Sequence, residues 1–303
     1  MGAMVMTRRD LIRGAAALSA WGTEIFAAEK ESRLSVEGYI FQQYAARQKK
    51  SLGEVLAEVI PMARVAGFRN VELNQGFFTP ELRAKTLDLL HANGLRMPSV
   101  YVGGVMHEAA AAAKTTELAL EIAELCKPFG CAGVVNNPSP KPKAEEKTDA
   151  ELILQGQLLN LLGGALATKG SELRIHNHTP EMVNGAREFR STLRNTGPKK
   201  VKVCLDIDWV RQGDQDPYAL LLEAGSRVTE IHVRNAKDKL WLETFGAGDV
   251  DYSRVAAQMR RNRQVPLIVV ELAWRDNTAM TRGLQENLTL GRVYAEKVFG
   301  VKA

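Results

Sequence analysis

The chain has 303 residues, of which 45% are hydrophobic, and its 40 lysines and arginines nearly balance 35 aspartates and glutamates. This size and composition fit one large domain with a sizeable core and argue against extended disorder. The formal charge of +5 does not indicate a nucleic-acid partner, because the short basic runs at 47–50, 199–202 and 260–263 lack the aromatic residues that stack on bases.

The first 28 residues resemble a twin-arginine export signal. A basic pair, Arg8 and Arg9, precedes a weakly apolar stretch that is too short to span a bilayer. We therefore expect an exported, periplasmic protein with no stable membrane association and a mature domain at 33–303. Because Glu24 interrupts the apolar stretch, a cytoplasmic protein with a frayed N-terminus is the alternative.

From residue 34 onward, short β-type runs alternate with longer stretches of helical periodicity. The amphipathic stretches include 52–61, 116–126 and 149–162, where apolar residues recur at intervals of three and four. This alternation forces parallel strands joined by crossover helices. The predicted strands span 34–39, 69–73, 95–101, 131–136, 173–177, 201–206, 230–233 and 267–271.

Eight such units predict an α/β fold, namely a closed (β/α)8 TIM barrel. The competing architecture, a doubly wound open sheet, would place a glycine-rich phosphate loop after the first strand, and residues 40–46 contain no glycine. No shift in composition divides the chain. The stretch 138–147, rich in proline and charge, is expected to be a long exposed loop.

Five of the predicted strands end on residues that can bind a metal or move a proton. Successive side chains of a strand face opposite sides, so Asp206, His232 and Glu271 stand on the face opposite to their apolar neighbours. Burying an isolated ionisable group costs several kcal/mol unless something compensates it, and a shared cation would do so. The groups at the five strand ends are Glu72, His176 with His178, Asp206, His232 and Glu271.

Histidines and carboxylates without paired cysteines favour a divalent ion such as Mn²⁺, Co²⁺, Mg²⁺ or Zn²⁺. Three cysteines, Cys126, Cys131 and Cys204, show no metal-type spacing and are interpreted as small buried apolar residues. Cys204 shares a strand face with Asp206, so a ligand role for its sulfur is the alternative.

Six segments make the chain resemble the xylose-isomerase-like barrel superfamily of sugar isomerases and epimerases over residues 33–300. Their order and spacing are more specific than any one of them. The resemblance implies that groups at the ends of strands five to eight hold a metal. The segments are 67–73, 176–182, 204–210, 230–235, 245–252 and 269–272, and the implied ligands are His176, Asp206, His232 and Glu271.

Strand five departs from the pattern of the superfamily's epimerases. These commonly present a glutamate there, opposed to the glutamate of strand eight, whereas this chain has His-Asn-His at 176–178. It is more similar to the subgroup that includes enzymes acting on 3-keto-glycosides, which cleave the glycosidic bond by elimination. The resemblance thus implies a lyase or hydratase of a 3-keto-glycoside, with an isomerase or epimerase of a free ketose as the alternative.

Two other functions are disfavoured. A barrel-type DNA-repair endonuclease would need additional histidines for several zinc ions, and the chain contains only 5. An export signal also argues against a genomic substrate. A sugar-binding protein without catalysis is the non-enzyme alternative, and the sequence leaves a homo-oligomer open.

Both sugar reactions remove the proton next to a carbonyl. A divalent cation would polarise that carbonyl and stabilise the resulting enediolate, and imidazole, with an unperturbed pKa of about 6.5, suits the base. His176 is preferred over His178 as the ligand. The candidate catalytic groups are His178, Glu271 and Glu72, and the candidate substrate contacts are Trp209, Arg234, Asn136, Glu181 and Glu243.

Overall fold

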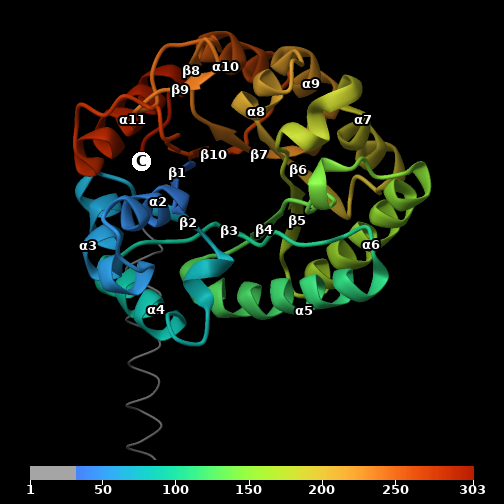
Figure 1. Cartoon of the computed structure of the whole chain (residues 1–303), viewed down its shortest axis with the longest axis horizontal. Helices are drawn as coiled ribbons and strands as arrows, with labels where there is room; N and C mark the ends of the chain where they lie inside the picture. Colours follow the sequence, from blue (N-terminus) through green and yellow to red (C-terminus); the bar gives the residue numbers. More distant parts are fainter. Residues whose placement is uncertain (1–31) are drawn as a thin grey trace, which may run out of the picture. The chain divides into compact units, whose positions relative to one another are not determined.

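The computed structural model describes residues 32–303, in which Arg33–Ala303 form one compact unit. The predicted export signal lies outside the described residues. Eight parallel strands close into a barrel in the order β1-β10-β7-β6-β5-β4-β3-β2, surrounded by helices (Figure 1). The predicted (β/α)8 barrel is confirmed.

All eight predicted strands are present; β6 has the predicted bounds, and the other seven differ at one or both ends. The barrel strands are β1 Leu34–Glu37, β2 Asn70–Asn74, β3 Ser99–Tyr101, β4 Gly133–Asn136, β5 Glu172–Ile175, β6 Val201–Asp206, β7 Val228–Val233 and β10 Leu267–Val270. A two-stranded antiparallel hairpin, β8 Ala236–Lys237 and β9 Leu240–Trp241, follows β7.

The helices include the three amphipathic stretches expected from the sequence. The α-helices are α2 Tyr39–Arg47, α3 Leu52–Val65, α4 Arg83–Ala92, α5 Ala109–Cys126, α6 Asp149–Thr168, α7 Thr179–Asn195, α8 Ile207–Gln212, α9 Pro217–Ala224, α10 Tyr252–Arg261 and α11 Leu284–Phe299. The short 3-10 helices are η1 Gln75–Phe78, η2 Lys127–Phe129, η3 Pro142–Ala144 and η4 Gly225–Arg227.

Five strands are shorter than expected, namely β1, β3, β4, β5 and β10. Two of them, β1 and β3, are shortened for a local reason. Gly38 ends β1 because its backbone leaves the extended conformation, with φ −83° and ψ −2°, as the N-cap of α2; a Cβ there would lie 2.6 Å from the Leu73 side chain. Pro98 delays β3 because proline has no N–H for the ladder, so Arg96 makes only an isolated bridge to Asn70.

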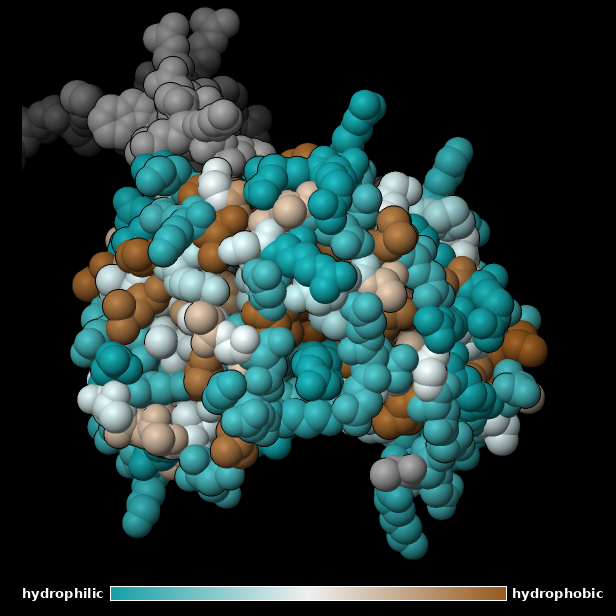
Figure 2. Space-filling model, turned by 90° about the horizontal axis from the view of Figure 1, so that it is seen from above, coloured by the Kyte–Doolittle hydropathy of each residue, from teal (hydrophilic) through white to brown (hydrophobic). Residues whose placement is uncertain are grey.

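The core lies inside the barrel and between the barrel and its helices. Strand residues are buried on both faces, as in other parallel sheets covered by helices. The three cysteines are free and buried, as expected. On the face drawn in Figure 2, hydrophilic residues cover most of the surface, with apolar side chains scattered among them. Within residues 32–303, no helix has the length and apolar character needed to cross a bilayer.

The loop at 138–147 is exposed, as predicted, over only part of its length. Residues 139–146 with described side chains are intermediate or exposed, but the loop ends on Lys147, which is 4% exposed. Its Nζ lies 2.5 Å from Oε1 of Glu188 on α7. Sequence pattern alone could not identify this buried ion pair, because its two members lie 41 residues apart.

Candidate metal and substrate site

Four predicted metal ligands converge at the carboxyl ends of four adjacent strands, β5, β6, β7 and β10. One ligand atom from each residue lies within 4.8 Å of all the others, and all four residues are buried. The adjacency follows from the strand order of the closed barrel, which places β10 beside β7. The residues are His176, Asp206, His232 and Glu271.

The two ring nitrogens of His176 are buried and have no hydrogen-bond partner within residues 32–303. Nε2 lies 3.7 Å from Oδ2 of Asp206 and 3.6 Å from Oε2 of Glu271. These distances exceed a hydrogen bond, but two ligands that share a cation at about 2.1 Å lie roughly 3.0–3.5 Å apart. The orphaned imidazole and its two carboxylate neighbours therefore fit a divalent cation.

His232 presents its two ring nitrogens to different partners. Nδ1 lies 2.7 Å from Oε2 of Glu271, on the side of the other ligands, and Nε2 lies 3.0 Å from Oε1 of Glu72. This arrangement matches a carboxylate–histidine–metal unit, in which one nitrogen binds the ion and the other faces a carboxylate. Glu72 therefore contacts the cluster from behind, through the His232 ring.

Glu72 is part of a buried polar chain in the barrel interior. The Ser99 hydroxyl lies within hydrogen-bond distance of carboxylates on Glu72 and Glu230, the latter at 2.8 Å, and Arg174 bonds Glu230 at 2.8 Å. Burial and then the nearby Glu230 raise the pKa of Glu72 to about 7. For Glu230, burial is opposed by Arg174, His232 and the hydrogen bond with Glu72, which together lower its pKa to about 2. The guanidinium fits because residue 133 is glycine, where a Cβ would lie 2.4 Å from Arg174 Cζ.

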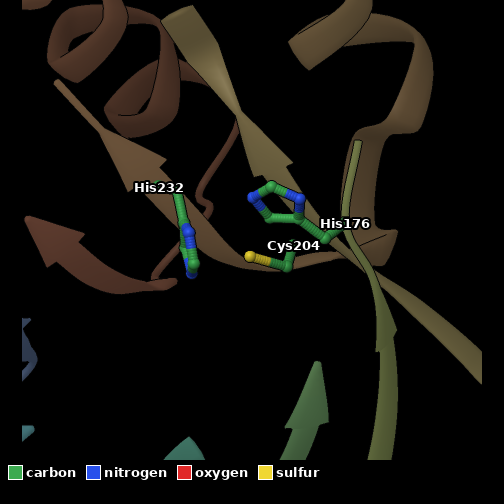
Figure 3. A group of neighbouring side chains, drawn as sticks. All are labelled: His176, Cys204 and His232. Atoms are coloured by element: carbon green, nitrogen blue, oxygen red, sulfur yellow. The ribbon is translucent and has the colours of Figure 1, made fainter. Parts of the chain in front are cut away.

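Cys204 is a second donor near the two histidines. Figure 3 shows the rings of His176 and His232 side by side in an edge arrangement, with the Cys204 thiol near both. These three residues also satisfy the spacing of a metal-binding group. Burial raises the pKa of the Cys204 thiol well above its usual value. For Glu271, burial is opposed by Arg234, His176 and His232, which together hold its pKa well below the usual value. The ionised carboxylate is thus the readier ligand.

Arg234 covers the carboxylate side of the cluster. Its Nε lies 3.2 Å from Asp208, its Nη2 lies 3.4 Å from Asp206, and its Nη1 bonds Glu271. The guanidinium carbon also lies 4.7 Å from the ring centre of Trp209. Arg234 is 3% exposed, so it neutralises these carboxylates from within the protein.

In the His-Asn-His segment, the asparagine binds the backbone and the two histidines turn toward the site. The Asn177 side chain binds the end of β6 through two hydrogen bonds. Its Oδ1 accepts from the Asp206 N–H at 3.0 Å, and its Nδ2 donates to the Asp206 carbonyl at 3.1 Å. The flanking His176 and His178 turn toward the site, with ring centres 4.8 Å apart. Burial and His176 lower the pKa of His178 to about 3, so its imidazole is neutral at physiological pH.

A cavity of about 620 Å³ opens above the cluster. Glu271 and His178 both line it, on the half of the barrel that holds the candidate metal ligands. The opposite half contributes residues from the ends of β1, β2 and β3 and from α2. The lining comprises Glu37, Tyr39, Gln42, Asn74, Gln75, Gly76, Tyr101, Gly103, His178, Trp209, Arg234, Trp241 and Glu271.

This architecture agrees with a comparison of the sequence against protein families. A model of the xylose isomerase-like TIM barrel matches residues 36–291. The chain belongs to this family. No curated protein sequence gives a significant match.

Solved structures with the same fold share little sequence with this family member. A sugar phosphate isomerase/epimerase from Parabacteroides distasonis has a TM-score of 0.71 at 17% identity, covering 91% of this chain and 97% of that one. L-ribulose 3-epimerase has a TM-score of 0.66 at 15% identity, covering 89% and 95%. The probable 3-DHS dehydratase of Bacillus anthracis, involved in petrobactin synthesis, has 0.63 at 15%, covering 85% and 96%.

Four residues proposed from the sequence as substrate or catalytic groups do not line the cavity. Glu72 lies beneath His232. Asn136 donates to the Val102 carbonyl at 2.7 Å. Glu181 accepts the His178 N–H at 2.7 Å in a capping box, and Glu243 binds residues of the segment before α11, including Thr281 at 2.8 Å. These side chains hold the loops and strands that shape the site.

Sequence reasoning missed much of the cavity wall. Glu37 was detectable, because it ends the first strand on an ionisable residue like the five groups that were noted. Tyr101 likewise ends β3. Trp241 was not detectable from the sequence, because the β8–β9 hairpin places it on the cavity wall. There its Nε1 donates to Asp208 at 3.0 Å.

Proposed function

We propose that the protein is a metal-dependent carbohydrate enzyme that works through an enediolate, and that it cleaves a 3-keto-glycoside as a lyase or hydratase. The observation that carries this proposal is the orphaned His176 imidazole, which lies near two carboxylates, one of them the cavity-lining Glu271. The solved relatives support a sugar or related polyol as the substrate, and one of them is a probable dehydratase.

In this proposal, His176, Asp206, His232 and Glu271 hold the cation. A bound divalent ion would polarise a sugar carbonyl and stabilise negative charge on its oxygen. Arg234 adds a fixed positive charge beside two of the ligands, which favours a developing enediolate over a neutral ketone. Trp209 and Trp241 place apolar walls beside that charge and limit the access of water.

The elimination balances without an oxidant. A base takes the proton from C2, and the C–H electron pair forms the enediolate with the C3 carbonyl. An electron pair on the enediolate oxygen then re-forms the C3 carbonyl. The electron pair of the C2–C3 double bond moves to form a C1–C2 double bond, and the C1–O bond breaks with its electrons leaving on oxygen. The leaving oxygen takes up a proton as an alcohol. Addition of water at C1 would complete the hydratase reaction.

Two residues of the lining can accept the proton. His178 is neutral and faces the cavity beside His176, although a pKa of about 3 makes it a weak base. Glu37 stands on the opposite half of the barrel with Oε2 held by the Tyr39 N–H at 2.6 Å. We assign His178 as the base, because it lies on the same strand end as a metal ligand.

Glu37 also favours a second function, epimerisation of a free ketose. Two carboxylates, Glu37 and Glu271, line one cavity, and epimerisation needs two acid–base groups on opposite sides of a carbon. Several solved relatives are named as sugar epimerases. The test is a parallel assay of the metal-loaded protein with 3-keto-glycosides and with free ketoses. Release of the aglycone supports the lyase; interconversion of ketoses with 3-keto-glycosides left intact supports the epimerase.

A further inference from the structure

The cavity has two chemically different halves. The metal ligands come from β5, β6, β7 and β10, which are consecutive in the barrel. In the same order, β2 is four strands away from β6 and therefore lies across the barrel from it. The end of β2 and the neighbouring α2 carry three side-chain amides on the cavity wall, which we call the amide shelf: Gln42, Asn74 and Gln75.

Arg234 is the only lysine or arginine in the cavity lining, and its nitrogens are already engaged. Each of the three nitrogens lies against a different carboxylate, on Asp206, Asp208 or Glu271. Turning this guanidinium toward a phosphate would leave buried carboxylates without their partner, which is strongly unfavourable. The lining also contains the carboxylate of Glu271, which repels an anion.

The backbone offers no anion cradle at the shelf. Two glycine N–H groups there could have bound a phosphate oxygen. The Gly76 N–H instead donates to Oδ1 of Asn74 at 2.9 Å, and the Gly103 N–H donates to Oε1 of Gln75 at 2.7 Å. Neutral amide oxygens therefore satisfy both donors.

The hydrogen-bonding groups that remain free on the shelf suit the hydroxyl groups of a ligand. Gln42 and Asn74 fix one another through two hydrogen bonds of 3.2 and 2.7 Å, so their amides are pre-oriented. The Nε2 of Gln75 has no hydrogen bond to any residue in the described part of the chain and can donate into the cavity. Tyr39 and Tyr101 add aromatic faces. A small number of polar groups at fixed positions beside aromatic walls is typical of sites for neutral ligands.

We infer that the amide shelf is a second sugar subsite, and that the cavity selects an uncharged glycoside of at least two rings over a sugar phosphate. This inference rests on the proposed carbohydrate function. The volume of about 620 Å³ lies within the range of about 300–1,000 Å³ that encloses drug-sized ligands, and so exceeds what one ring needs. The reacting ring occupies the metal half, and the second ring lies on the shelf.

Equilibrium binding tests the inference without turnover, because unoxidised glycosides are not substrates of the proposed reaction. Calorimetry on the metal-loaded protein would compare a panel of neutral disaccharides with glucose, glucose 6-phosphate and inorganic phosphate. We expect at least one disaccharide to bind about tenfold more tightly than glucose, and inorganic phosphate not to compete with it. Tighter binding of glucose 6-phosphate than of glucose, or no disaccharide better than glucose, would overturn the inference.

A near-isosteric variant locates the second ring. Gln75→Glu keeps the oxygen that accepts the Gly103 N–H but removes the free amide donor. We expect it to weaken disaccharide binding by about tenfold while glucose binding and metal content stay unchanged; equal weakening of both sugars would contradict the subsite. Gln157→Glu on the exposed face of α6 is the matched control. Glycoside binding without cleavage of any 3-keto-glycoside would reject the proposed function and leave this inference standing.

Discussion

The Nε2 atom of His232 lies 3.0 Å from Oε1 of Glu72, and neither atom has a hydrogen bond to another residue among those described. Because the opposite nitrogen, Nδ1, faces Glu271, this contact decides which nitrogen is free to bind a cation. Glu72 is in turn held by Ser99. Glu72, which the sequence suggested as a base, thus lies behind His232 and not on the cavity wall, and we predict that it is a positioning group.

Glu72→Gln should weaken metal binding by about 10- to 100-fold, the usual effect of removing the carboxylate behind a metal-bound histidine. Calorimetric titration with Mn²⁺ or Co²⁺ measures it, and nitrogen NMR of the His232 ring should report a changed tautomer balance. Thr86→Ala, which removes another fully buried hydrogen bond, is the control. An unchanged metal affinity in the glutamine variant would show that Glu72 only fills space.

Asp206→Ala should abolish metal binding, because no other residue replaces this carboxylate between His176 and Arg234. Alanine also removes the acceptor of the Trp209 N–H at 2.7 Å. Asp206→Asn retains an oxygen for that hydrogen bond and separates the two effects. Metal content by elemental analysis should be near zero in the alanine variant and reduced in the asparagine variant; full occupancy in both would remove Asp206 from the ligand set.

Much of the barrel was predictable because strand and helix periodicities alternate through the whole domain. The residues of the candidate metal cluster were predictable for a related reason: an ionisable residue at the end of a buried strand stands out against apolar neighbours, as Asp206 does in β6. The roles of Glu181 and Glu243 were not, since a carboxylate that caps a helix or binds a loop has the same sequence appearance as one that faces a substrate.

The substrate half of the site was the least predictable part. Gln42 and Asn74 form their pair across 32 residues, and Gln75 reaches Gly103 across 28. Such contacts depend on how the loops above the barrel are set, which no local periodicity encodes. The Arg234 guanidinium was assigned to substrate from its place after strand seven, and it does line the cavity. Its contacts with three carboxylates of the protein could not be predicted from the sequence.

Deletion of residues 1–28 should leave a folded domain, because the first strand begins at Leu34. Circular dichroism and cooperative thermal unfolding of the shortened protein check this expectation. Loss of folding would assign the segment to the domain. In a separate export assay, changing Arg8 and Arg9 to lysine should block translocation if the segment is a twin-arginine signal.

Stability should fall as pH rises through the range where Glu181 loses its proton. Burial and the nearby Glu188 raise the pKa of Glu181 to about 7 in the folded protein, against about 4.3 in an unfolded chain. Between these values the folded state binds the extra proton, so its stabilising effect is complete below about pH 4 and is lost as pH rises through about 7. Glu181→Gln keeps an acceptor for the His178 N–H and should gain in relative melting temperature from pH 5 to pH 8; a constant difference contradicts the assignment.

His178→Ala should retain metal yet lose about 10² to 10⁴-fold in activity if this imidazole is the general base. Metal is retained because His178 is not among the four converging ligands, and its loss leaves the His176 contacts to Asp206 and Glu271 in place. Wild-type protein in D₂O should place deuterium at the carbon next to the carbonyl in recovered 3-keto-glycoside, and the variant should not. If His178→Ala keeps full activity while Glu37→Gln loses both activity and deuterium incorporation, the base is the carboxylate on the opposite half of the barrel.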